Sequence, residues 1–431
     1  MHHSTSRICL VTSRHVSYNP RLYKEACALS NAGFLVRVVG PNLDPRKSDL
    51  EEEQVNEESW TLDRINAQRH GKGHWRWLRD ALRQRLLNRI PLLQRLPYGM
   101  ERAYSRHVDA LFHTAIAQPA DLFVAHNLQA LPAAAWAAEH QGSLLGFDAE
   151  DFHRGEFNYD NLATPKRSLT IEIEETYIPQ CDHLTAASPG IADAYEEILD
   201  INRPTVILNV FPKQKRSGQT PSSELAKETP GEAFSIYWYS QTIGPDRGLE
   251  HVVCALPEVQ TKSRPVFLSL RGRWNDGYEH SLRNLAREIG VGGHLRHLSP
   301  VPPEELIERA AQHDIGLALE QPVSRNREIC VTNKLFAYLL AGLPVVATRT
   351  QGQKAVCANL SSATRLCTPD NSAQIAEAIS SLLESNEKLR RAEKAAWAAG
   401  EERYNWEVEQ NRLINAFEET ISSAQLSSFS A

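Results

Sequence analysis

A strand–helix–strand pattern at the start of the chain limits the possible folds most. The buried run RICLVTS is followed by NPRLYKEACALSNAG, where Leu22, Ala26 and Leu29 recur at helical spacing and Gly33 ends the helix. The run FLVRVVG then predicts a second buried strand. Two strands joined by a helix within about 35 residues form a βαβ unit, which requires a parallel sheet.

The same alternation continues along the chain and restarts after a polar segment. Further strand-like runs are ADLFVAHN, SLLGFDAED and DHLTAASPG in the first half, and FSIYWYS, PVFLSLRG, HLRHLSP, DIGLALE and LPVVATR in the second. Residues 213–232 are rich in Ser, Pro and Lys, which is typical of a linker. We therefore expect an α/β protein with two Rossmann-like, doubly wound domains, which bind ligands in a cleft at the carboxyl ends of the strands.

The length agrees with this division. A chain of 431 residues suits two domains of roughly 200 residues each. The expected boundaries are 1–212, a linker at 213–232, a second domain at 233–400 and a C-terminal helix at 401–431.

Composition excludes several functional classes. The net charge of −6 gives no sign of nucleic-acid binding. The N-terminus has no apolar stretch suited to a signal peptide, and no segment approaches the roughly 20 apolar residues of a transmembrane helix. Seven scattered cysteines without a Cys-x-x-Cys pair predict reduced thiols and no metal site. We expect a cytoplasmic protein whose membrane contact, if any, is peripheral.

The stretch TNKLFAYLLAGLPVVATR is the most informative single motif. It predicts a helix that ends at Gly342, since Pro344 cannot continue it, and a short strand after it. The triplet Thr332, Asn333 and Lys334 stands where a helix N-terminus and a full positive charge would together suit a phosphate group. A capping Thr or Asn with a solvated Lys explains the triplet equally well.

More charged side chains fall near strand ends in the second half. Arg247 precedes a helix in IGPDRGLEHVV, and Arg271 and Arg273 end the run LSLRGR. Each is ambiguous alone, but together with Lys334 they favour an anion pocket. Glu320 and Glu328 are separated by seven residues, and ionised carboxylates suit sugar hydroxyls.

In the first half, polar residues follow two predicted strands. His126 ends the run DLFVAH, and Glu150 and Asp151 follow GFDA, beside His153. Such positions supply reactive groups to a cleft, although a strand-end histidine is often structural. Arg21 lies in the first turn of the first helix, where the dipole disfavours a cation, so it either serves an anionic acceptor or faces solvent.

One segment has a different pattern. Apolar residues recur at helical spacing over 75–90, with arginines between them, before Pro91 breaks the helix. A basic amphipathic helix with tryptophan is typical of a membrane surface element, unless its apolar stripe packs inside the protein. The expected membrane-contact residues are Trp75, Arg76, Trp77, Arg79 and Arg83.

Together these segments resemble a glycosyltransferase of the GT-B fold, close to family 4 (group 1). The resemblance covers nearly the whole chain and depends on SYNPRLYKEACALSNAGFLVRVVGP, DLFVAHNLQALPAAAWAA, CDHLTAASPGIADAYEE, VILNVFP, YSQTIGPDRGLEHVVCAL, DIGLALE, TNKLFAYLLAGLPVVAT and YNWEVE, in the order of the family. It implies a second domain that binds a nucleotide-diphosphate sugar, a first domain that binds the acceptor, and a last helix that crosses back to the first domain. It also implies a retaining reaction that needs no metal.

The resemblance assigns roles to single residues. Arg247 and Lys334 match the two diphosphate contacts, and His126 matches the histidine near the reacting sugar. Glu150 stands where many relatives have histidine. Ala337 replaces the glutamate that binds the ribose in many relatives, which leaves Glu328 or no residue for that contact. The remaining candidates for donor binding are Arg271, Glu320, Thr332 and Asn333.

Three functions remain open at this point. The first is a retaining glycosyltransferase that uses a glycan or lipid-linked acceptor in surface polysaccharide or glycolipid biosynthesis, with the inner face of the cytoplasmic membrane as a candidate location. The second is a degenerate subunit, which Ala337 favours. The third is a sugar-nucleotide epimerase of the same fold, which would use Glu150, Asp151 and His153. The sequence identifies neither the sugar, the nucleotide, the acceptor nor the oligomeric state.

Overall fold

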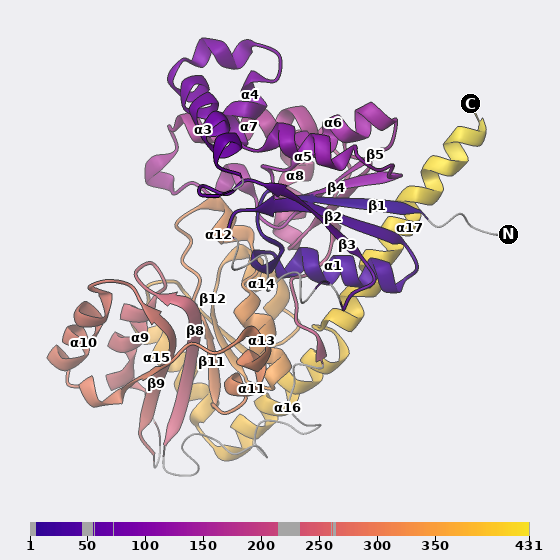
Figure 1. The fold of residues 1–431 in the computed structure, drawn as a ribbon. Helices are drawn as coiled ribbons and strands as arrows, with labels where there is room; N and C mark the ends of the chain where they lie inside the picture. Colours follow the sequence, from indigo (N-terminus) through magenta and orange to yellow (C-terminus); the bar gives the residue numbers. More distant parts are fainter. Residues whose placement is uncertain are drawn as a thin grey trace. The chain divides into compact units, whose positions relative to one another are not determined.

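The computed structural model describes residues 6–44, 55, 57–71, 73–213, 233–259, 261 and 264–430. The chain forms two compact units, coloured by sequence in Figure 1. The first unit comprises Met1–Ala187, Ile191–Ile207 and Gln410–Ala431, and the second comprises Ser188–Gly190 and Leu208–Glu409. Apart from Lys213, the linker expected at 213–232 lies outside the described residues.

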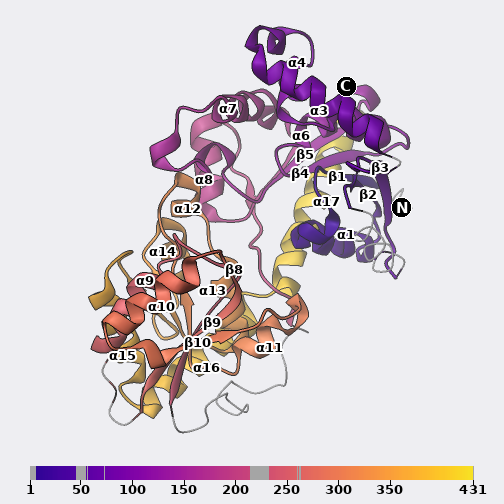
Figure 2. The same ribbon diagram turned by 60° about the vertical axis from the view of Figure 1, so that its left-hand side comes forward.

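The first unit contains a seven-stranded parallel sheet with the order β3-β2-β1-β4-β5-β6-β7. Its strands are β1 (Arg7–Thr12), β2 (Leu35–Asn42), β3 (Thr61–Asn66), β4 (Leu122–His126), β5 (Leu144–Ala149), β6 (His183–Ala186) and β7 (Thr205–Val206). Its helices include α1 (Pro20–Asn31), α3 (His74–Arg89), α4 (Gly99–Tyr104), α5 (Val108–Ala115), α6 (Leu131–Gln141), α7 (Pro165–Tyr177) and α8 (Pro189–Leu199). Figures 1 and 2 show α1 on one face of this sheet and α6 on the other, and Figure 1 shows α5 on the same side as α6.

The second unit contains a six-stranded parallel sheet with the order β10-β9-β8-β11-β12-β13. Its strands are β8 (Phe234–Ile243), β9 (Val266–Trp274), β10 (Leu295–Leu298), β11 (Ile315–Ala318), β12 (Val345–Thr348) and β13 (Thr364–Cys367). Its helices include α9 (Leu249–Ala255), α10 (Tyr278–Glu288), α11 (Leu306–Ala310), α12 (Arg325–Ile329), α13 (Asn333–Ala341), α14 (Gln351–Cys357), α15 (Ser372–Leu383) and α16 (Asn386–Glu402). In Figure 1, α9, α10 and α15 cover one face of the sheet, and α11, α13 and α16 cover the other.

These two sheets confirm the predicted fold class. Every strand expected from an apolar run is present, but β3, β7 and β13 were not expected. At least half of the residues in β3 and β13, TLDRIN and TRLC, are polar, and β7 has only two residues. All three are edge strands of their sheets, where less burial leaves a weaker hydrophobic pattern.

The helix expected from the stretch TNKLFAYLLAGLPVV is α13. Leu335, Tyr338 and Leu339 are fully buried, and Gly342 ends the helix in the left-handed conformation with φ of 77°. A Cβ atom at Gly316 of β11 would lie 2.3 Å from the ring of Tyr338. This glycine therefore allows α13 to lie close against the sheet, which fixes the position of the residues at the start of the helix.

The last helix, α17 (Trp406–Ser430), begins in the second unit, and its residues from Gln410 onward belong to the first. Among the described residues, no helix has both the length and the apolar character needed to span a bilayer.

Candidate functional site

The strand order of the second unit brings two loops together. The order reverses at β8, which pairs with β9 on one side and β11 on the other. Ligands of doubly wound sheets bind outside the carboxyl ends of the strands at such a reversal. The loop from Gly244 to Gly248 follows β8, and Glu320 follows β11, so topology alone places both at the expected binding position.

Glu320 is the centre of a cluster of charged side chains. It is 8% exposed, and its two carboxylate oxygens lie 3.3 Å from Nη1 of Arg327 and 3.4 Å from Nζ of Lys334. Burial alone would raise the pKa of Glu320, but Lys334, Arg327 and a hydrogen bond from Thr332 lower it below its ordinary value. Glu320 is therefore a carboxylate at neutral pH.

Arg247 is the third cation of this cluster. It lies in a tight turn, because Asp246 and Gly248 have φ of 58° and 69°. Burial, followed by the positive charge of Arg327, lowers the pKa of Arg247, while Glu320 opposes this effect. Two basic side chains thus contact one buried carboxylate, and a third, Arg247, interacts with it electrostatically. This excess of positive charge suits a multivalent anion.

The structure places the start of α13 in this cluster and rejects the capping alternative. Thr332 is the N-cap residue, but its side chain makes no capping hydrogen bond. The side chain of Lys334 is only 12% exposed, with its Nζ 5.5 Å from the ring centroid of Trp238. Lys334 is therefore held inside the cluster and is not a solvated surface lysine. Asn333, the first helical residue, is exposed.

The other predicted donor residues make different contacts. Arg271 is buried, and it donates to the Tyr237 hydroxyl and to the backbone carbonyl of Ser299, both at 2.8 Å. Glu328 lies on α12, where its Oε1 accepts from the backbone N–H of Gln351 at the start of α14. Their roles in donor binding remain predictions.

Sequence reasoning missed Arg327, which lies seven residues after Glu320 and seven before Lys334. This regular spacing could have suggested that Arg327 belongs with Glu320 and Lys334. The spacing alone does not show that the three side chains meet, because it is the short helix α12 and the turn before α13 that bring them together.

In the first unit, His126 belongs to a buried network of charged groups. It ends β4, where the strand order reverses between β1 and β4. Its Nε2 lies 3.0 Å from Oε1 of Glu25, and its Nδ1 lies 3.4 Å from Oδ2 of Asp148. Burial alone would lower the pKa of His126, but the carboxylates of Glu25 and Asp148 raise it.

Arg21 completes this network and is not in the environment that was predicted. It is 2% exposed, so the solvent-facing alternative is wrong. Its Nε and Nη2 donate to Asp148 at 2.6 and 2.7 Å, and its Nη1 donates to the carbonyl of Ile207 at 2.6 Å. Because all three donor positions are engaged, Arg21 positions Asp148, and its guanidinium is not free to serve an anionic acceptor. The ion pair also explains how a cation is accommodated in the first turn of α1.

The network also has the composition of a metal site. Glu25, His126 and Asp148 bring ligand-type atoms within 4.8 Å of one another. However, Arg21 contacts both oxygens of Asp148, and Thr185 donates to its Oδ1 at 2.6 Å. Burial would raise the pKa of Asp148, but Arg21 lowers it to about 2. The guanidinium already supplies the positive charge that a metal ion would contribute here.

Glu150 and Asp151 follow β5 directly, as expected. Burial and the neighbouring charge of Asp151 raise the pKa of Glu150. A carboxyl group with a raised pKa at a strand end can hold a proton for acid–base chemistry. Their catalytic assignment, like that of His126, remains a prediction.

The predicted membrane-contact residues of α3 have two kinds of environment. Trp75, Arg76 and Arg79 are exposed. Trp77 instead lies between the guanidinium groups of Arg69 and Arg106, each 5.5 Å from its ring, and Arg83 forms an ion pair with Asp109. Trp77 and Arg83 therefore hold the helix to its own unit.

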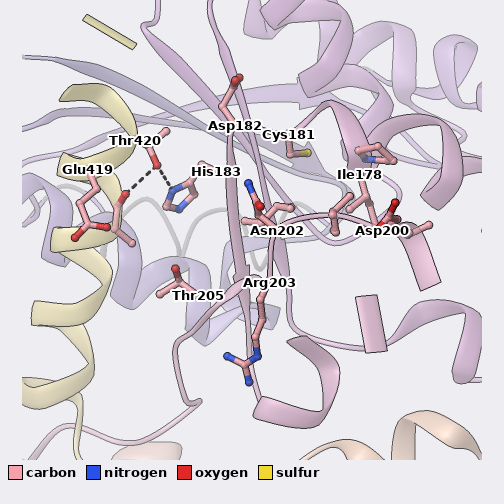
Figure 3. A pocket seen from close by; sticks show the side chains of 15 residues that line it. Ile178, Cys181, Asp182, His183, Asp200, Asn202, Arg203, Thr205, Glu419 and Thr420 are labelled. Carbon is pink, nitrogen blue, oxygen red and sulfur yellow. Dashed lines mark hydrogen bonds between the residues drawn. The ribbon is translucent and has the colours of Figure 1, made fainter. Parts of the chain in front are cut away.

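A separate hollow of about 470 Å³ lies in the first unit (Figure 3). Its lining includes His183 at the amino end of β6, Thr205 at the start of β7, Arg203 just before that strand, and Thr420 of α17. Nδ1 of His183 lies 3.0 Å from Oγ1 of Thr420, a contact drawn in Figure 3. This hollow is at the amino ends of the strands, whereas His126 is at a carboxyl end, so we assign it no part in the chemistry.

Comparison with known proteins gives a class to this arrangement. Residues 224–398 match the family model described as "Glycosyl transferases group 1". The match confirms the resemblance to group 1 glycosyltransferases over these residues. No curated protein matches the chain.

Three solved structures illustrate the likeness in fold. Anabaena Alr3699/HepE in complex with UDP has a TM-score of 0.67 at 16% identity, over 97% of this chain and 100% of that one. Sucrose-phosphate synthase from Thermosynechococcus elongatus has a TM-score of 0.70 at 15% identity, over 97% and 100%. WaaG, a glycosyltransferase involved in lipopolysaccharide biosynthesis, has a TM-score of 0.58 at 15% identity, over 95% and 98%. The chain has the GT-B fold of these proteins.

Proposed function

We propose that this protein is a retaining glycosyltransferase that transfers a sugar from a nucleotide-diphosphate sugar to a glycan or lipid-linked acceptor. The observation that carries the proposal is the cluster of Arg247, Arg327 and Lys334 around Glu320 at the strand-order reversal of the second unit. The cluster lies inside the segment that matches the group 1 family.

The three cations have a chemical role in such a reaction. When the bond between the sugar and the diphosphate breaks, negative charge accumulates on the departing phosphate oxygens. Fixed positive groups in a partly buried site stabilise that charge, typically by about 3 kcal/mol for each group. We propose that they do so without a divalent metal, and activity that persists in a chelator would support this.

The carboxylate of Glu320 suits the donor's sugar. A sugar presents hydroxyl donors, and an ionised carboxylate accepts two or more hydrogen bonds. Cations that bind the diphosphate and a carboxylate that binds the sugar are the two requirements of a nucleotide-sugar pocket. UDP or UDP-glucose is bound in the structures of Alr3699/HepE, so uridine nucleotides are the first to test.

We assign the acceptor to the first unit, where His126 ends β4 and Glu150 follows the adjacent strand β5. The raised pKa of Glu150 suits a group that exchanges protons. The raised pKa of His126 favours its protonated form, which suits an electrostatic contact to a reacting sugar. We propose a surface polysaccharide or glycolipid as the product, and the cytoplasmic face of a membrane as the place of reaction.

Ala337 is the main argument for a degenerate subunit. It is fully buried on α13, so it provides no group that could bind ribose. Lys334, one turn earlier on the same helix, nevertheless belongs to a charged cluster whose composition suits a diphosphate. A protein that binds the donor without transferring sugar would support the degenerate subunit, and acceptor-free conversion of a nucleotide sugar would support the epimerase.

The first experiment is a thermal-shift screen of UDP-, GDP-, ADP- and dTDP-sugars against the wild type and Lys334→Ala. A specific ligand raises the melting temperature by mass action. Arg327 still pairs with Glu320 in the variant, so the fold should survive the change. Lys354→Ala, at an exposed position on α14, is the matched control.

We expect a shift with one nucleotide class that is lost in Lys334→Ala and retained in the control. In a transfer assay, Lys334→Ala and Arg247→Ala should each lower turnover about a hundredfold. If no nucleotide sugar shifts the wild type, the proposed donor pocket is wrong and the degenerate subunit becomes the better interpretation.

A further inference from the structure

The helix α3 has two contrasting faces. Asp80, Ala81 and Leu87 are buried, and Leu87 packs with Ala103 of α4 and Leu169 of α7. The opposite face carries Trp75, Leu82 and Leu86, which are 79%, 55% and 53% exposed. These three residues are spaced by seven and four positions, so they form one continuous apolar stripe. The stripe predicted from the sequence is therefore not part of the core among the described residues.

The exposed apolar surface continues beyond the helix. A 3₁₀ helix, η2 (Pro91–Arg95), follows α3, and Leu92, Leu96 and Tyr98 in and after it are all more than half exposed. Half of the exposed large apolar residues found in the described part of the chain fall between residues 75 and 98. Exposed apolar side chains concentrated in one segment indicate an interaction surface, whereas single ones do not. Figures 1 and 2 both show α3 and α4 at an outer edge of the first unit.

Positive charge borders the apolar stripe. Arg76 lies on one side of it, and Arg85 and Arg89 lie on the other, while Arg95 belongs to η2. All four side chains are exposed, and none has an ion-pair partner within the described ranges. The one acidic residue of α3, Asp80, is buried and pairs with Arg79 and Arg83. The face therefore presents apolar and positive groups without a compensating negative charge.

We propose that this face, Trp75 to Tyr98, docks onto a lipid surface that carries anionic phosphate headgroups. An arginine guanidinium can donate two parallel hydrogen bonds to the oxygens of one phosphate. Trp, Leu and Tyr side chains enter the boundary between headgroups and acyl chains. A protein partner would have to supply an acidic groove as well as an apolar one, whereas an anionic bilayer supplies both properties over its whole surface. The idea that docking brings the site to a lipid-linked acceptor rests on the proposed function, but the docking itself does not.

The experiment measures cosedimentation of the full chain with vesicles of phosphatidylglycerol and phosphatidylcholine, and with vesicles of phosphatidylcholine alone. One variant carries Trp75→Gln, Leu82→Gln and Leu86→Gln, and its control carries Ile198→Gln and Leu426→Gln at other exposed positions. A second variant carries Arg76→Gln, Arg85→Gln and Arg89→Gln. Its control makes the same charge change at the exposed residues Arg287, Arg390 and Arg391 of the second unit.

We expect the wild type to bind the anionic vesicles, and added salt to weaken this binding. Each phosphate-facing arginine contributes about fivefold, so the arginine variant should bind about a hundredfold more weakly. The apolar variant should show a similar loss, and both controls should bind like the wild type. All the changed residues are exposed, so circular dichroism should show unaltered folding.

Three outcomes would overturn the proposal. The wild type could remain free of anionic vesicles, or both variants could bind as it does. A wild-type dimer that dissociates in the apolar variant would show instead that a second copy covers this face. Nucleotide-sugar thermal shifts in the same variants test the donor pocket separately. Docking without a shift would reject the proposed function alone, and a shift without docking would reject this inference alone.

Discussion

Replacing Glu320 with glutamine would remove one negative charge from the centre of the cationic cluster with little change of shape. In the free protein this carboxylate contacts Arg327 and Lys334 at 3.3 and 3.4 Å. A bound diphosphate would use the same cations while being repelled by the same carboxylate. Glu320→Gln should therefore strengthen the binding of a nucleoside diphosphate, even though it weakens the protein's own charge pairing.

The magnitude follows from Coulomb's law. One charge acting on another at about 6 Å contributes roughly 3 kcal/mol at the effective dielectric constant of about 20 that applies near a protein surface. Desolvation and ionic screening reduce this value, so we expect a net gain of about 1–2 kcal/mol, or about five- to thirtyfold in the dissociation constant. The complete nucleotide sugar should gain less, because a charged hydrogen bond from Glu320 to a sugar hydroxyl is lost, at a cost of about 1.5–3 kcal/mol.

Isothermal titration calorimetry of the nucleoside diphosphate and its sugar ester would measure both effects. The matched control is Glu377→Gln, which makes the same charge change at an exposed position on α15. The characteristic result is a change in the ratio of the two affinities, since a nonspecific effect of charge would strengthen both ligands equally. If Glu320→Gln binds the diphosphate no more tightly than the wild type does, these cations do not form the diphosphate site.

Three further predictions concern the network and the backbone around the two sites. The ring of His126 should titrate above pH 6.5, and Glu25→Gln should lower its midpoint, as followed by histidine NMR with His126→Gln for assignment. Because the folded-state pKa is raised, this pair's contribution to stability is complete below about pH 6.5 and is lost as the pH rises through the folded-state value; a midpoint below 6.5 would contradict the assignment. Gly248→Ala should cost about 1–2 kcal/mol of stability and about tenfold in donor affinity, because its φ is 69° and the new Cβ would lie 2.4 Å from Nε2 of Gln321. Gly290→Ala has the same backbone strain at φ of 80°, but nothing lies within 4 Å of the new Cβ, so this variant should lose stability and keep its donor affinity. Equal donor affinity in the two variants would show that the turn at Gly248 is not part of the donor site. Ala337→Glu should destabilise the second unit by several kcal/mol in urea unfolding, since it buries a carboxylate, with Ala337→Ser as the milder control; a stable variant with tighter nucleotide binding would instead show that the site can accept the missing glutamate.

The sequence predicted the backbone better than the network of charges. Apolar runs such as RICLVTS and LPVVATR correctly predicted strands, because a short strand buried on both faces needs continuous apolar residues. TLDRIN and TRLC lack that signal, so β3 and β13 were missed. The helix α13 was predicted to its last residue because Gly342 and Pro344 act locally on backbone conformation.

Charged side chains depend on strand order, which the sequence does not contain. Arg21 and Asp148 are 127 positions apart, and only the parallel pairing of β1, β4 and β5 brings them within 2.6 Å. For that reason the unfavourable helix position of Arg21 suggested that it contacts a substrate or faces solvent. Its partner in the structure is instead Asp148, near the end of β5. Lys334 and Arg271 likewise looked equivalent as strand-end or helix-start cations. Lys334 contacts the carboxylate of Glu320 near the point where the strand order reverses. Arg271 instead donates hydrogen bonds to Tyr237 and Ser299. Whether a cation remains available to a ligand is thus decided by its partners in space, and this is why the affinity ratio in Glu320→Gln tests the pocket more directly than any motif.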